Sequence, residues 1–222
     1  MEAISQQTLD FLKKLKKNND REWFNRNRKL YDSAKSEFEK FIDGIIREIA
    51  RFDPILRGLE ASSCMYRINR DIRFSNDKSP YKSHLGAFIT RGGRKNGEKY
   101  AGYYIHIEPG AGMIAGGAYM PPAPWLNAIR AKIDNEPERL IKILKNKDFV
   151  RYFGELQGEK LKKTPRGYEA SHPQAELLKH KSYLVVNSPS DSEVTGPSYF
   201  SHVISVARAM KPLNDFLNDY EA

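Results

Sequence analysis

The spacing of apolar residues changes twice along this chain, and the order of the resulting segments limits the folds available to it. Before Pro54, apolar side chains recur at alternating intervals of three and four, at Tyr31, Ala34, Phe38, Phe41, Ile45, Ile49 and Phe52. This spacing predicts a long amphipathic helix that ends before the proline. Asn19 and Glu22 have the spacing of a capping box at its start, and a shorter helix is predicted for residues 6–16.

After Gly58 the apolar residues alternate with polar ones, which is typical of β-strands. We expect strands at residues 65–70, 85–90, 100–108, 113–119 and 183–186, joined largely by short polar turns that favour antiparallel pairing. Helical spacing returns after Pro122 and again over residues 199–217. The sequence therefore predicts an α+β fold, with an antiparallel sheet in the middle of the chain and N- and C-terminal helices packed mainly on one face.

Composition predicts a single domain over residues 1–222, because 40% hydrophobic residues can supply one substantial core. Cys64 is the sole cysteine, which excludes an intrachain disulfide and a zinc site built on cysteines. The N-terminus lacks a signal-peptide pattern, and no window has the apolar length of a membrane span. We therefore expect a cytoplasmic protein with no membrane partner.

Positive charge is concentrated in one part of the chain. The formal net charge is +9. Residues 67–95 contain eight cations and two carboxylates, so that 8 − 2 = +6 of this charge lies there. Such a concentration indicates a local positive field and makes anionic partners plausible, namely nucleic acid, phosphorylated metabolites or acidic proteins.

Three motifs lie in and after this basic segment. They read Arg67-x-x-Arg70-Asp71-x-Arg73-Phe74-Ser75-x-Asp77-Lys78-x-Pro80-Tyr81-Lys82, then Gly102-Tyr103-Tyr104-x-His106-x-Glu108-Pro109-Gly110, then Gly116-Gly117-x-x-Met120-Pro121. Together they resemble the DUF2461 family, and the likeness covers nearly the whole chain. The resemblance implies a cytoplasmic single-domain protein of unknown function. It supplies no substrate, cofactor or catalytic residue.

The cations of the first motif suit oxyanion recognition, because arginine binds phosphate or carboxylate through two parallel hydrogen bonds and lysine adds a compact charge. We predict that an anionic small molecule binds a cradle of Arg67, Arg73, Lys78, Lys82 and His84. Structural ion pairs are predicted for Arg70, Asp71 and Asp77, with Arg70 on the apolar side of a strand. The alternative is that the whole run is an internal salt-bridge network that fixes a loop to the sheet.

His106 and Glu108 are the candidate catalytic residues, with the histidine as general acid/base oriented by the carboxylate. They lie on one face of a predicted strand and can meet His84 across the sheet. The histidines have no short ligand spacing, so no metal site is predicted, and no cofactor is indicated.

Two other functions remain open. One is a nucleic-acid-binding module that uses the same basic surface together with Lys160, Lys162, Lys163 and Arg166, with tyrosines as stacking faces. The other is a non-catalytic interaction scaffold. A phosphate-binding P-loop is rejected, because Glu98-Lys99 follows Gly97 where Lys-Ser or Lys-Thr is required.

Overall fold

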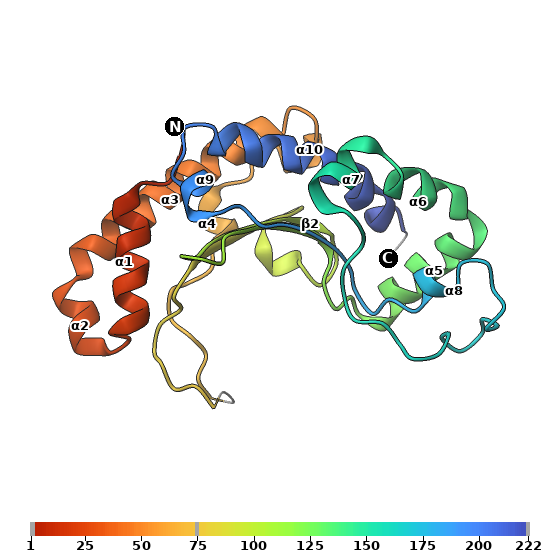
Figure 1. The fold of residues 1–222 in the computed structure, drawn as a ribbon, viewed down its shortest axis with the longest axis horizontal. Helices are drawn as coiled ribbons and strands as arrows, with labels where there is room; N and C mark the ends of the chain where they lie inside the picture. The colour runs from red at the N-terminus through yellow and green to blue at the C-terminus, as the bar shows by residue number, and fades with distance from the viewer. Residues whose placement is uncertain (1–2, 74–75, 221–222) are drawn as a thin grey trace.

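A computed structural model describes residues 3–73 and 76–220, and its centre is an antiparallel sheet with helices on one face (Figure 1). The four strands follow one another in sequence order across the sheet. They are β1 (Leu85–Ile89), β2 (Gly102–Ile107), β3 (Met113–Ala118) and β4 (Tyr183–Asn187). The predicted α+β class and four of the five predicted strands are confirmed.

Helices lie at both ends of the chain and between β3 and β4. The N-terminal ones are α1 (Gln6–Lys17), α2 (Arg21–Arg26), α3 (Arg28–Ile49), η1 (Pro54–Leu56) and α4 (Ala61–Cys64). The turn between β1 and β2 holds η2 (Arg94–Asn96). The others are α5 (Ala123–Asn135), α6 (Pro137–Leu144), α7 (Lys147–Phe153), α8 (Ala175–Leu178), α9 (Asp191–Val194) and α10 (Tyr199–Asn218). Within the described ranges, no helix is both long and apolar enough to cross a bilayer.

The start of the long N-terminal helix differs from the prediction. Asp20, one residue after Asn19, caps α2 by accepting a hydrogen bond from the Trp23 amide at 2.8 Å, and the long helix α3 begins only at Arg28. The Asn19 side chain bonds the main chain of Tyr81 instead, donating to its carbonyl at 2.9 Å and accepting from its amide at 3.0 Å. Asn19 therefore fixes a distant segment and is not a helix cap.

Helices α3 and α10 cover one face of the sheet, and the strands alternate accordingly (Figure 1). Tyr103, Ile105 and Ile107 of β2 are at most 1% exposed and belong to the core. Successive residues of a strand point to opposite faces, so Tyr104 and His106 point away from the helices. We call this second face, which bears Tyr104 and His106, the open face.

Helix α10 approaches β3 very closely at Gly116. A Cβ atom at this position would lie 2.1 Å from the Met210 sulfur and 2.4 Å from the Gly102 carbonyl oxygen. Since real Cβ contacts are never that short, only glycine permits this packing.

The prediction of a strand at residues 65–70 is wrong. The described parts of residues 66–84, which we call the arm, extend below the sheet edge in an irregular conformation (Figure 1). Isolated bridges join Met65 to Ala87 and Asn69 to Tyr81. The polar sequence around Ile68 offers too few apolar side chains to cover a fifth strand, so the face pattern inferred from a continuous strand does not apply. Phe74 and Ser75 lie outside the described residues.

We expect Gly116→Ala to lower the free energy of unfolding by about 1–3 kcal/mol, because the added methyl group overpacks the contact between α10 and β3. Urea unfolding followed by circular dichroism measures this. Ala115→Ser is the matched control, since it adds one atom on the open face of the same strand. Equal stability of the two variants would contradict the proposed packing constraint.

Candidate functional site

The open face of the sheet forms the floor of a cavity of about 740 Å³. Apolar side chains of β1, β3 and β4 line this floor together with Tyr104 of β2, namely Phe88, Met113, Ala115, Leu184 and Val186. Polar and aromatic side chains of the arm, of the β1–β2 turn and of the end of β3 form the rim, namely Tyr66, Lys82, His84, Arg94, Lys95, Glu98 and Tyr119. The cavity therefore combines an apolar floor with a cationic edge.

Two of these cations contact one aromatic ring. The Lys82 Nζ lies 5.2 Å from the centre of the Tyr66 ring, and the Arg94 guanidinium carbon lies 5.5 Å from it. Each side chain also donates to a main-chain carbonyl, Lys82 to Arg67 at 2.9 Å and Arg94 to Met65 at 2.7 Å. These bonds hold both charges at the end of the cavity nearest the arm.

The positive charge at this end is not neutralised within the described part of the chain. Neither Lys82 nor Arg94 forms an ion pair there, and Arg67 forms none. Burial, together with the charges of Arg67 and Arg94, lowers the pKa of Lys82. Three cations therefore repel one another at a partly buried place, which favours the binding of an anion.

A hydrogen-bonded chain of polar side chains lies beside these cations. The Tyr104 hydroxyl is 2.9 Å from His106 Nδ1, and His106 Nε2 is 3.1 Å from Glu108 Oε2. The other carboxylate oxygen, Oε1, accepts from Ser83 at 2.8 Å and lies 3.4 Å from Lys16 Nζ. His106 is thus held from both sides, with each ring nitrogen engaged by a neighbouring side chain.

Burial sets the protonation of this group. It lowers the pKa of His106 against the opposing effect of Glu108, and it raises the pKa of Tyr104 to about 12. Burial also raises the pKa of Glu108, but hydrogen bonds from Ser83 and His106 outweigh it, so the pKa lies below its usual value. At neutral pH the group therefore contains a neutral imidazole, a neutral phenol and a carboxylate.

His84 joins this group from the arm. Its ring centre is 4.2 Å from that of His106, and the metal-ligating atoms of His84, His106 and Glu108 all lie within 4.8 Å of one another. Burial, followed by the charges of His106, Lys82 and Arg70, lowers the pKa of His84 to about 4. The fold thus brings His84, which precedes β1, to the His106 and Glu108 pair at the end of β2.

The predicted cradle is divided between two places. Lys82 and His84 line the cavity, whereas Arg73 and Lys78 are farther out on the arm and do not. Arg73 donates to Asp71 at 2.9 and 2.7 Å, and Lys78 donates to the Ile72 carbonyl at 3.0 Å. Anion binding by these residues stays a prediction.

Arg70 forms an ion pair with Asp77, which is one of the partners predicted for it. Asp71 forms an ion pair with Arg73. The Arg70 and Asp77 side chains are 29% and 55% exposed, so the pair is not buried and should contribute less than about 1 kcal/mol.

Several residues that line or adjoin the cavity were not identified from the sequence. The alternation of β1 and β4 places Phe88, Leu184 and Val186 on one face, and that signal was available. No local signal points to Ser83 or to Lys16, which reaches Glu108 across 92 positions of the chain.

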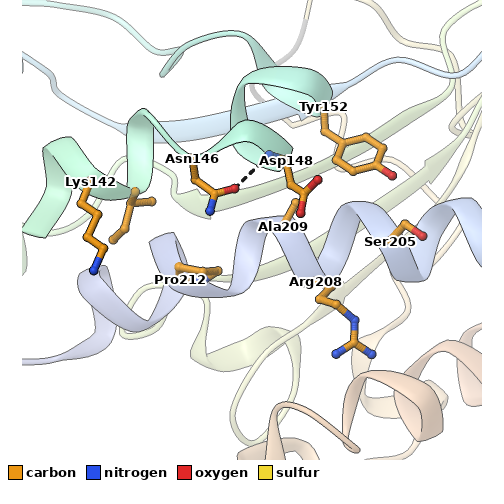
Figure 2. A pocket seen from close by; sticks show the side chains of 9 residues that line it. Lys142, Asn146, Asp148, Tyr152, Ser205, Arg208, Ala209 and Pro212 are labelled. Carbon is orange, nitrogen blue, oxygen red and sulfur yellow. Dashed lines mark hydrogen bonds between the residues drawn. The ribbon is translucent and has the colours of Figure 1, made fainter.

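A second cavity of about 460 Å³ lies between α7 and α10 (Figure 2). Two of its polar groups are engaged: Asn146 accepts from the Asp148 amide at 2.9 Å as the cap of α7, and the Arg208 guanidinium lies 4.3 Å from the Phe52 ring. In Figure 2, Arg208 points away from Asp148. The cavity on the open face, where unneutralised cations converge, is therefore the better candidate.

Comparison with known families finds a match to a family described as a conserved hypothetical protein (DUF2461), over residues 7–216. The chain matches no curated protein and no solved structure. The resemblance noted in the motifs is thus confirmed over most of the chain.

His84 makes stability depend on pH. Its pKa is about 4 when folded and 6.5 in the unfolded chain, so the unfolded state binds more protons between these values. We expect the free energy of unfolding to fall as the pH is lowered from about 6.5 toward 4, and to fall less steeply in His84→Gln. Urea unfolding across this range, in buffer with a chelator, compares the two slopes. Identical slopes would contradict the burial of a neutral His84.

Proposed function

We propose that this chain, which belongs to the DUF2461 family, binds a small anionic ligand with an apolar or aromatic body in the cavity on the open face. One observation carries the proposal. Lys82 and Arg94 flank the ring of Tyr66 at one end of the cavity, and neither has a carboxylate partner among the described residues.

The anionic group of the ligand would meet these cations. Arg67, Lys82 and Arg94 repel one another, and partial burial of Lys82 adds a desolvation cost. A phosphate or carboxylate offsets both costs, because charge-assisted hydrogen bonds are about twice as strong as neutral ones. Arginine also offers a planar pair of donors for such a group.

The body of the ligand would lie on the strands. Phe88, Leu184 and Val186 offer apolar contact, and the Tyr66 ring offers a face for stacking. A volume of about 740 Å³ falls within the usual range of small-molecule sites, roughly 300–1,000 Å³. A bare inorganic anion would leave most of this surface uncovered, so the apolar floor favours a larger ligand.

The proposal uses only part of the cradle predicted from the sequence. Lys82 and His84 contribute to it directly, Arg67 contributes charge, and Arg94 joins them from the β1–β2 turn. Arg73 and Lys78 remain candidates for contacts with a ligand that extends along the arm.

We expect 1-naphthyl phosphate, used as a fluorescent probe, to bind the wild-type chain with saturation. Lys82→Gln should weaken this binding by about tenfold or more, because it removes a charge-assisted hydrogen bond. The neutral compound 1-naphthol and inorganic phosphate alone should each bind more weakly than the probe.

Arg91→Gln is the control for net charge. Its guanidinium lies 5.2 Å from the Tyr100 ring, and Arg91 does not line the cavity on the open face. The Arg91→Gln substitution should leave the affinity for the probe unchanged. Equal losses in both variants, or no saturable binding by the wild type, would refute the proposed site.

Ionic strength separates this function from nucleic-acid binding. An interface that contacts about six to ten phosphates loses about three to five decades of affinity between low and physiological salt. We expect the affinity for 1-naphthyl phosphate to fall far less than this across the same salt series. Fluorescence anisotropy with single- and double-stranded oligonucleotides provides the comparison, and tight, steeply salt-dependent oligonucleotide binding would favour the nucleic-acid module.

A further inference from the structure

We infer that His84, His106 and Glu108 form a binding site for one divalent first-row transition-metal ion at the end of the cavity. No metal site was predicted from the sequence, because the histidines lack a short ligand spacing and only the fold can bring His84 to His106 and Glu108. The sheet supplies the missing proximity by pairing β1, which follows His84, with β2, which carries His106.

The distances suit a metal after a small adjustment. Metal bonds to histidine nitrogen and carboxylate oxygen are about 2.0–2.2 Å long, so two ligands of one ion lie at most about 4 Å apart. His106 Nε2 and Glu108 Oε2 already lie 3.1 Å apart. The widest separation in the group is within 4.8 Å, and a rotation of the His84 ring shortens it.

Neighbouring side chains orient two of the ligands, as partners of metal ligands commonly do. Tyr104 holds His106 through Nδ1, which directs Nε2 toward Glu108. Ser83 and Lys16 both contact Oε1 of Glu108, which leaves Oε2 for the ion. When the metal replaces the contact between Nε2 and Oε2, the His106 proton resides on Nδ1 and is donated to the Tyr104 oxygen.

The third ligand has no other partner. Within the described ranges, the His84 ring forms no hydrogen bond, although it is partly buried and lines the cavity. A ring nitrogen of His84 is therefore available to a metal ion without breaking an existing hydrogen bond.

The donor set indicates the class of ion. Two imidazole nitrogens and one carboxylate oxygen suit Zn²⁺, Fe²⁺ or Mn²⁺, whereas Mg²⁺ prefers oxygen ligands alone. Three protein ligands also leave a coordination position open, as in catalytic zinc sites. Because His84 lines the cavity, an ion held by these residues would lie close to the place of the anion.

The surrounding cations then gain a second role. Lys82, Arg70 and Lys16 lie near the ligands and weaken the binding of a bare cation, so an anion in the open position would strengthen it. We therefore place the anionic group of the ligand between the metal and Lys82. This step rests on the proposed function, whereas the metal site itself does not.

The metal site is tested with the ion alone. Full-length protein is stripped with a chelator, dialysed, and titrated with Zn²⁺ against a metal indicator, with the visible spectrum of bound Co²⁺ as a second readout. We expect about one equivalent to bind. His84→Ala and Glu108→Gln should each weaken binding by at least about tenfold, and Tyr104→Phe should weaken it by about tenfold while preserving the stoichiometry.

His172→Ala is the matched control, since His172 pairs with Asp134 and lies outside the group. Circular dichroism checks that each variant is folded. If His84→Ala does not fold, the near-isosteric Glu108→Gln variant still tests the site. The inference is overturned if the wild type binds no metal, or if folded His84→Ala and Glu108→Gln variants bind it as the wild type does.

A final comparison separates the two proposals. We expect 1-naphthyl phosphate to bind more tightly to Zn²⁺-loaded protein than to stripped protein, and Glu108→Gln to abolish the difference. Probe binding that depends on Lys82 without any metal uptake would overturn the metal site and leave the proposed function standing. Metal uptake without saturable probe binding would overturn the proposed function and leave the metal site standing.

Discussion

The close contact between helix α10 and strand β3 at Gly116 determines what the other face of the sheet can do. Because glycine lets the helix lie directly on the strands, the core forms on that face. Met210 packs against Gly116 there, and Tyr103, the strand partner of Gly116, is buried. Except for η2, whose Arg94 and Lys95 line the cavity on the open face, the remaining helices join the same layer or the ends of the sheet (Figure 1). The opposite face is left with apolar side chains and room for a ligand.

The alternation of side chains along β2 follows from this constraint. Tyr103 faces the helices and donates to the buried Asp53 at 2.8 Å, whereas Tyr104 faces the cavity and contacts His106. A shift of one residue in register would exchange the two tyrosines and remove His106 from the open face. The packing of the core and the position of the candidate site therefore depend on the same register.

Local pattern predicted the strands and the candidate pair His106 and Glu108, because alternation and face are properties of a few neighbouring residues. The start of the arm, up to Arg70, was mistaken for a strand, because a short alternating segment does not reveal whether a partner strand lies beside it. Its true path depends on contacts such as that of Asn19 with Tyr81, 62 positions away. The division of the cradle, with Lys82 at the cavity and Arg73 beyond it, could not be predicted for the same reason.

Among the described residues, the ion pairs of the basic motif and its unpaired cations Arg67 and Lys82 lie in different parts of the arm. Asp77 and Asp71 pair with Arg70 and Arg73, which neutralises charge along the arm away from the cavity. At its base, Arg67 and Lys82 meet Arg94 with no carboxylate to balance them in the described part of the chain. The stacking of Tyr81 on Phe24, with ring centres 3.9 Å apart, ties this base to α2. The arm thus places unbalanced charge and His84 at the one end of the cavity where Glu108 is also found.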